Sequence, residues 1–148
     1  MQYFTKSYFL FISFFFLYSV VQAQDYSEII QNSGKSTDYP GSHVLTIFDR
    51  TKVEVEESGL GHFHMHQFYK ILDEKGALNM RVMKFPYEPM SAFLKIYEVN
   101  IYRIDGTIES VPLSHVYDYP APANLILWGA REQMVEIDCL DIGEAVYY

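Results

Sequence analysis

The chain has 148 residues with 19 acidic and 11 basic side chains, a formal net charge of −8, and 17% of its residues are aromatic. Binding to nucleic acid or to an anionic membrane surface needs clustered lysine and arginine, and here the basic residues are scattered, so the composition argues against both partners. Hydrophobic residues make up 49% of the chain, which is enough for one packed domain and argues against disorder.

The first 23 residues have the composition of a secretory signal peptide. Lys6 is the single charged residue there, an apolar run follows from residue 8 to residue 21, and Val21-Gln22-Ala23 fits a cleavage site. The run is too short for a spanning helix, which needs about 20 apolar residues. We therefore expect an exported protein of a Gram-negative type of bacterium, periplasmic, outer-membrane-associated or extracellular, with no stable membrane span after residues 1–23 are removed.

Residues 24–42 are polar and predict a linker with one short helix around residues 26–31. From His43 onward, short runs rich in valine, isoleucine, phenylalanine, tyrosine and threonine alternate with turn residues. Thr51, Val53 and Val55 alternate with charged residues, a period of two that places the apolar groups on one face of a strand.

Further strands are predicted over residues 62–72, 80–85, 93–104 and 107–111. A turn is expected at residues 73–76, where Gly76 can take a positive φ. Asp105-Gly106 predicts a two-residue type I′ hairpin, because both of its central residues need positive φ. Strands recurring about every ten residues, without a long helical period, predict an all-β fold, an antiparallel β-sandwich over residues 43–148.

The end of the chain does not fit this pattern. Residues 145–148 form a β-prone run directly after a turn at residues 141–144, and a strand that starts there has no later partner in the sequence. Proteins avoid an unpaired hydrophobic edge strand because it promotes aggregation. We therefore expect an incomplete sandwich whose natural chain continues beyond Tyr148.

Three histidines alternate along one predicted strand. His62, His64 and His66 would share one face of it, and H-x-H spacing can place two imidazoles on one zinc, copper or nickel ion. No fourth ligand is identifiable, and a solvated strand face gives the same pattern. The three histidines are therefore weak metal candidates, and no cofactor is predicted.

The sequence contains no recognisable catalytic set. Cys139 is the one cysteine, all five histidines precede it, and its neighbour Asp138 does not favour a reactive thiolate, so we expect Cys139 to be buried as a small hydrophobe. A G-x-S-x-G elbow and a glycine-rich phosphate loop are both absent from the sequence. No residue is predicted to be catalytic.

Residues 117–124 depart from the strand rhythm. Pro120 and Pro122 favour an extended segment, and Tyr119 and Trp128 could present an aromatic surface to a partner. The alternative is a rigid connection between strands whose aromatic rings pack on the core.

Three blocks of sequence resemble a known family. The first covers residues 54–76 and ends in Lys-Ile-Leu-Asp-Glu-Lys-Gly, the second covers residues 99–109 around Asp105-Gly106, and the third runs from residues 118–123 through 128–131 to 140–144. In this order, behind a signal peptide, they resemble domain of unknown function 3857, the N-terminal β-domain that precedes a transglutaminase-like core in exported bacterial proteins. The resemblance covers about residues 46–148.

The resemblance implies a β-sandwich followed by a papain-like fold that uses cysteine, histidine and aspartate in that order. No histidine follows Cys139, so that catalytic set is not present in these residues. The implied function is a non-catalytic exported module that positions, or contributes recognition surface to, a downstream transglutaminase-like or cysteine-protease-like domain acting on cell-envelope protein or peptide. The alternative is a self-standing periplasmic domain that binds a metal through His62, His64 and His66, or a glycan or peptide through the aromatic residues between Tyr119 and Trp128.

Overall fold

The structure is a computed structural model that describes residues 26–121 and 129–148. The predicted signal peptide lies outside these ranges, as do Pro122 and Trp128 of the predicted partner surface. Within the described ranges, no helix is both long enough and apolar enough to cross a membrane.

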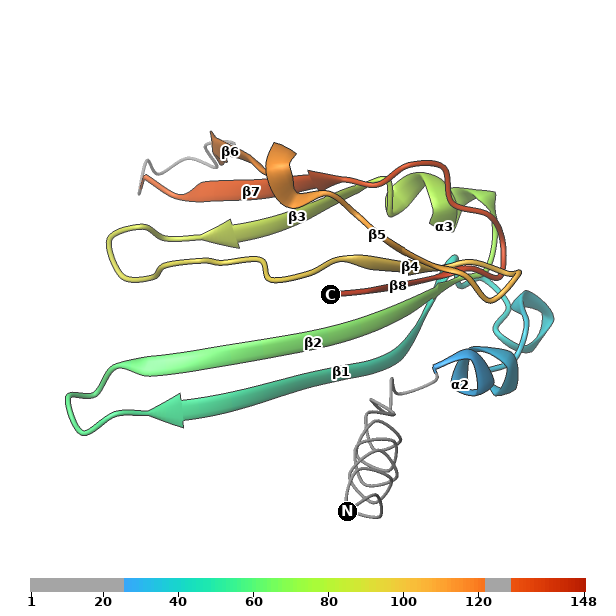
Figure 1. Ribbon diagram of the computed structural model, residues 1–148, viewed down its shortest axis with the longest axis horizontal. Helices are drawn as coiled ribbons and strands as arrows, with labels where there is room; N and C mark the ends of the chain where they lie inside the picture. The colour runs from blue at the N-terminus through green and yellow to red at the C-terminus, as the bar shows by residue number, and fades with distance from the viewer. Residues whose placement is uncertain (1–25, 122–128) are drawn as a thin grey trace, which may run out of the picture.

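Two antiparallel sheets make up most of the described chain, which confirms the predicted all-β fold (Figure 1). The larger sheet has the strand order β1-β2-β8-β4-β5, and the smaller has the order β3-β7-β6. The strands are β1 Val44–Val55, β2 Gly61–Ile71, β3 Val82–Tyr87, β4 Asn100–Tyr102, β5 Ile108–Ser110, β6 Tyr117–Pro120, β7 Arg131–Glu136 and β8 Ala145–Tyr147. The helices are α2 Ser27–Asn32 and α3 Glu74–Asn79, with 3₁₀ turns η2 Ser36–Asp38 and η3 Leu113–His115.

The main core lies between the two sheets. Ile71, Ile101 and Val146 of the larger sheet pack with Met83 and Val135 of the smaller one, and all five are buried. Each is supplied by the period-two alternation of its strand, and burying one such side chain contributes roughly 1.5–3 kcal/mol. This shared core holds the two sheets together.

The opposite face of the larger sheet packs against α2 at one end (Figure 1). Phe68, Tyr102, Ala145 and Tyr147 form a second buried cluster, and the Tyr26 ring that precedes α2 lies 5.2 Å from the Phe68 ring. The helix is held at its C-terminal end as well. Lys70 Nζ donates hydrogen bonds to the main-chain oxygens of Ile30 (2.8 Å) and Gly34 (2.7 Å), which supplies donors to carbonyls that a helix end leaves unpaired.

The β-prone run at the end of the chain is β8, a central strand. Tyr147 pairs with Phe68 of β2 on one side and with Asn100 of β4 on the other. The expectation of an unpaired edge strand is therefore wrong. It assumed that a strand pairs with a later one, whereas β8 lies between two strands that precede it in the sequence. Consecutive strands are neighbours in about two-thirds of cases, and β7 and β8 are an exception.

The expected turn at residues 73–76 is instead the start of α3. Asp73 caps the helix, because its Oδ1 accepts a hydrogen bond from the Gly76 N–H at 2.8 Å. Gly76 does not have the positive φ expected for a turn. A glycine is needed for another reason, since a Cβ at this position would lie 2.0 Å from the main-chain oxygen of His43.

The β4–β5 hairpin also differs in detail from the prediction. The Gly106 N–H donates to the Arg103 oxygen (3.1 Å) and the Arg103 N–H donates to the Thr107 oxygen (2.9 Å), with Gly106 at φ 87°. This is a three-residue connection closed by a left-handed glycine, rather than a two-residue type I′ turn. Of the strand expected over residues 93–104, only Asn100–Tyr102 is paired as β4.

Replacing Gly76 tests the close contact between α3 and the start of β1. We expect Gly76→Ala to lower the free energy of unfolding by about 3 kcal/mol, because the added methyl group overlaps main-chain atoms that cannot move aside. Lys75→Ala, on the exposed side of α3, should change it by less than about 0.5 kcal/mol. Urea unfolding followed by circular dichroism measures both, and equal effects would contradict the contact.

Asp73 gives the fold a defined response to acid. Its hydrogen bond to His43 (2.7 Å) and that to the Gly76 N–H lower the pKa of the Asp73 carboxyl. A lowered pKa means that the carboxylate stabilises the fold above its unfolded pKa of about 3.9, and that this contribution is lost as the pH falls through the folded value. Wild type should therefore be more stable than Asp73→Asn at pH 7, and the difference in urea midpoint should shrink toward pH 3. A difference that stays constant with pH would contradict this assignment.

Candidate functional site

The three histidines lie on one face of β2, as predicted, but they are engaged separately. His62 Nε2 lies 2.8 Å from Glu56 Oε1, and His66 Nδ1 lies 2.6 Å from the Tyr147 hydroxyl. In the part of the chain that the structure describes, no group of three or more His, Cys, Asp or Glu residues could hold a metal ion. The arrangement does not bring the predicted ligands together.

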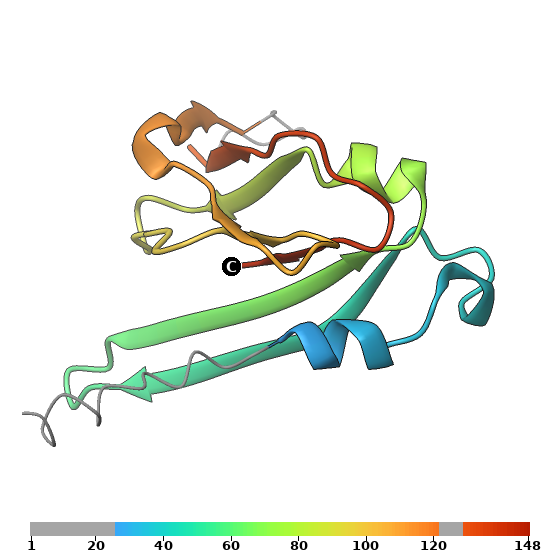
Figure 2. The same ribbon diagram turned by 45° about the vertical axis from the view of Figure 1, so that its right-hand side comes forward.

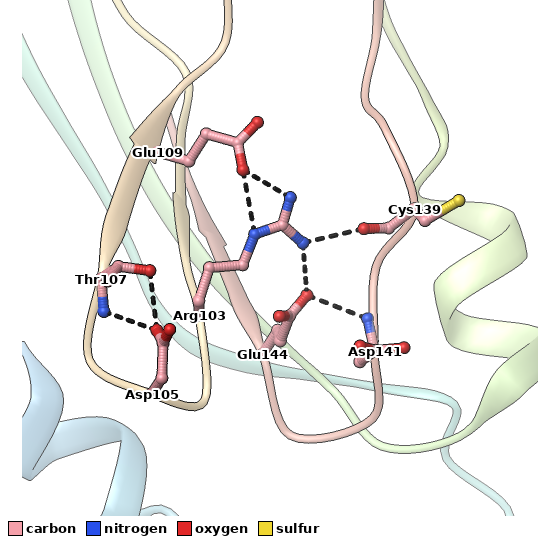
Figure 3. Close-up of polar contacts among 7 residues, drawn as sticks. All are labelled: Arg103, Asp105, Thr107, Glu109, Cys139, Asp141 and Glu144. Atoms are coloured by element: carbon pink, nitrogen blue, oxygen red, sulfur yellow. Dashed lines mark hydrogen bonds and ion pairs between the residues drawn. The ribbon is translucent and has the colours of Figure 1, made fainter.

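Cys139 is exposed, so the expectation that it is buried is wrong. It follows β7 in a segment without regular structure, where Ile137 and Leu140 are the residues that pack into the core. The period of two ends with β7, and the irregular backbone turns Leu140 inward while the Cys139 side chain points to solvent. The Cys139 main-chain oxygen accepts a hydrogen bond from Arg103 Nη1 at 2.8 Å (Figure 3).

Tyr119 and Pro120, from the predicted partner surface, lie on β6 at an edge of the smaller sheet. The rings of Tyr117 and Tyr119 stack with their centroids 6.0 Å apart, and both are exposed. Asp118, which lies between the two tyrosines in the sequence, accepts hydrogen bonds from the Tyr87 hydroxyl (2.7 Å) and from Arg131 Nε (2.8 Å). The described part of this surface is therefore an exposed aromatic edge of the smaller sheet.

A partly buried ionic cluster around Arg103 was not anticipated from the sequence (Figure 3). Arg103 Nη1 lies 2.8 Å from Glu144 Oε2, and Arg103 Nη2 lies 2.6 Å from Glu109 Oε2. The Glu144 carboxylate also accepts a hydrogen bond from the Asp141 N–H at 2.9 Å. The cluster joins the β4–β5 hairpin to the segment after β7 and to the turn that leads into β8.

The chemistry of this cluster fits an anchor better than an acid or base. Glu109 and then Glu144 raise the pKa of Arg103 above its already high usual value, so the guanidinium stays charged. The Glu144 side chain is only 5% exposed, and an unpaired carboxylate at that depth is strongly unfavourable. Arg103 therefore fixes the position of Glu144 and, through it, the start of β8.

A cavity of about 480 Å³ lies beside this cluster, between α2 and the β4–β5 hairpin. Lys70 and Arg103 both line it, yet their donors are already bound to the carbonyls at the end of α2 and to the carboxylates of Glu109 and Glu144. Lys35 lines the cavity as well, so two of its three cationic side chains serve internal contacts of the fold.

An apolar strip is exposed on the β1–β2 hairpin. We call Val53, Val55, Phe63 and Met65 the hairpin strip, and their side chains are 50–71% exposed. Val53 lies opposite Phe63, and residues directly opposite in an antiparallel pair point to the same side. By the period of two, this is the side on which Ile71 enters the main core, and the hairpin extends beyond the smaller sheet (Figure 1). Contiguous exposed apolar patches are a feature of interaction surfaces in many proteins.

Removing the Arg103 side chain tests the anchor. We expect Arg103→Met to lower the free energy of unfolding by about 3 kcal/mol, because it leaves the Glu144 carboxylate buried without its cation. Adding Glu144→Gln to Arg103→Met should recover part of this loss, since the uncompensated charge is then gone. Urea unfolding of both variants measures the two effects, and a loss below about 1 kcal/mol in the single variant would contradict the anchor.

Comparison with known proteins identifies the family. No curated protein matches the chain. The crystal structure of a "putative protease" from Parabacteroides distasonis ATCC 8503 aligns with a TM-score of 0.59 and 18% sequence identity, over 71% of this chain and 22% of that one, so the likeness is one of fold and this chain spans about a fifth of that protein. Residues 57–148 match the family described as a domain of unknown function, DUF3857. Because the match covers more than half of the chain, this protein belongs to the DUF3857 family.

Proposed function

We propose that the chain is a non-catalytic, exported β-module of a longer transglutaminase-like or cysteine-protease-like protein. Its role is to position, or contribute recognition surface to, a downstream catalytic domain that acts on cell-envelope protein or peptide. The hairpin strip is the observation that carries this proposal, because four apolar side chains at least half exposed on a projecting hairpin are unfavourable in water unless another surface covers them.

Other observations support parts of the proposal. Export rests on the composition of residues 1–23, and a longer protein is consistent with the 22% share of the "putative protease" that this chain matches. A structural rather than catalytic role fits the side chains of Arg103 and Glu144, since this ion pair holds the turn that precedes β8. The alternative of a self-standing metal-binding domain has less support, because His62 and His66 are engaged by Glu56 and Tyr147.

Neighbouring residues on opposite faces of β2 provide a matched test. Phe63→Asp alters the hairpin strip, whereas His64→Asp places the same residue on the other face of the same strand. In the isolated chain the two variants should lower the melting temperature by similar amounts. In the full-length protein, Phe63→Asp should lower the melting temperature of the downstream domain by several degrees more than His64→Asp, because it disrupts the contact between the domains.

The same pair of variants also defines the contrary result. Should Phe63→Asp and His64→Asp have equal effects in the full-length protein, as in the isolated chain, the hairpin strip does not contact the downstream domain and the proposed role fails.

A further inference from the structure

Strand β1 forms an open edge of the larger sheet. In Figure 1 and in Figure 2 it lies on the side of β2 away from β8, and among the described strands only β2 pairs with it. The strand has 12 residues and contains no proline, and residues 49–55 are all exposed. A long edge of this kind can accept another strand, because its outward backbone groups have no partner in the sheet.

The other edge strands are shielded in ways that β1 is not. β5 has three residues, and β3 contains Pro86, which has no N–H to donate. On β6, Pro120 likewise has no N–H, and the Asp118 oxygen accepts a hydrogen bond from Arg131 Nη2 at 3.0 Å. Short strands and prolines are devices that keep sheet edges from pairing. Their absence from β1 distinguishes this edge from the other three.

The open backbone groups of β1 belong to alternate residues. The Glu56 N–H donates to the Leu60 oxygen across the hairpin at 2.8 Å, and residues that bond to a neighbouring strand alternate with residues that do not. In the part of β1 beyond its bulge, the even-numbered residues therefore bond to β2. Thr51, Val53 and Val55 direct their N–H and C=O groups to the open side, where no other described residue bonds to them.

We infer that the open edge of β1 binds β1 of a second copy of this chain, antiparallel and about a two-fold axis at Val53. This pairing joins the two five-stranded sheets into one continuous sheet. It is β-strand addition, in which main-chain hydrogen bonds give affinity and side chains give specificity. The proposed function uses the exposed face of the hairpin strip, whereas this pairing uses the strand edge, so neither depends on the other.

An axis at Val53 brings the open backbone groups together. Val53 lies opposite Val53 of the second copy, and Thr51 lies opposite Val55 of the second copy. In each of these pairs the two residues exchange both N–H···O bonds. Their side chains are on the face of the hairpin strip, so the strips of the two copies become neighbours. The paired stretch, residues 49–57, ends before residues 45–47, where β1 lines a pocket with α2.

The charges of β1 are complementary in this register. Lys52 of each copy lies opposite Glu54 of the other, and Arg50 lies opposite Glu56. These pairs fall between the hydrogen-bonded ones, where opposing Cα atoms are closest, about 4.5 Å apart. Within one copy Lys52 Nζ lies 2.5 Å from Glu54 Oε1, so the four side chains around the axis form a ring of alternating charge. Opposite charges placed directly across two strands stabilise their pairing.

Other registers of the same edge bring like charges together. An axis at Lys52 places Lys52 opposite itself, and an axis at Glu54 places Glu54 opposite itself. An axis at residue 51 or residue 55 places two basic or two acidic residues of the even-numbered set opposite each other. Like charges directly across two strands are destabilising, and lysine on an edge prevents pairing in this way. Of these five axes, the one at Val53 is free of such contacts.

Two charge-reversal variants test the register by sedimentation velocity. Wild type should show a reversible monomer–dimer equilibrium. Lys52→Glu and Glu54→Lys should each weaken dimerisation roughly tenfold or more, because each makes two attractive pairs repulsive. Mixed in equal amounts, the two variants should dimerise with each other about as tightly as wild type, since every pair across the seam is again opposite in charge. Lys75→Glu, which makes the same change in net charge on the exposed side of α3, should leave dimerisation unchanged.

Amide hydrogen exchange measured by NMR separates edge pairing from other kinds of association. In wild type, exchange at Val53 and Val55 should slow as the protein concentration rises, because these amides face the second copy. The Lys52 amide already bonds to β2 and should change less.

Three results would overturn the inference. The first is a wild-type chain that stays monomeric up to about 1 mM, a concentration at which even a weak interface is populated. The second is a dimer that Lys52→Glu and Glu54→Lys leave intact, or variants that fail to recombine when mixed. The third is protection of Val53 and Val55 in a monomeric full-length protein, because another segment of the same chain would then occupy the edge. All three are independent of whether the hairpin strip contacts a downstream domain.

Discussion

Ala145, Val146 and Tyr147 pair with β2 on one side and with β4 on the other, so the larger sheet is continuous only while this strand is in place. Without β8 it would separate into the β1–β2 and β4–β5 hairpins, and isolated hairpins are marginally stable in water. The strand also joins the two buried clusters, because Val146 belongs to the main core and Tyr147 to the cluster under α2. The Arg103–Glu144 pair fixes the turn from which β8 starts.

Sequence patterns predicted what depends on neighbouring residues. The period of two located β2 and the apolar face of β1, and the composition of residues 24–42 indicated the short helix now seen as α2. The central position of β8 could not be predicted in this way, because its partners lie about 45 to 80 residues earlier in the chain. Asp73 was misjudged for a local reason: aspartate followed by a glycine three residues later is typical of a turn and also of a capped helix start.

The candidate site was less predictable than the fold. The histidines of β2 were found in the expected register, yet which side chain each contacts depends on Glu56 and on Tyr147, and the latter is distant in sequence. Arg103 and Glu144 are 41 residues apart, and no pattern in the sequence connects them. The described residues of this DUF3857 domain present three surface features: an exposed hairpin strip, an aromatic edge at β6 and an edge of β2 that extends beyond β8.

Native-state hydrogen exchange of the β8 amides tests most directly whether the larger sheet depends on this strand. The account predicts that the Val146 and Tyr147 amides exchange only through global unfolding, with the same free energy and denaturant dependence as the core amides of Ile71 and Ile101. The contrary result would be exchange of β8 by local opening, at rates like those of the exposed end of the β1–β2 hairpin, while Ile71 and Ile101 stay protected. In that case the sheet would not depend on β8.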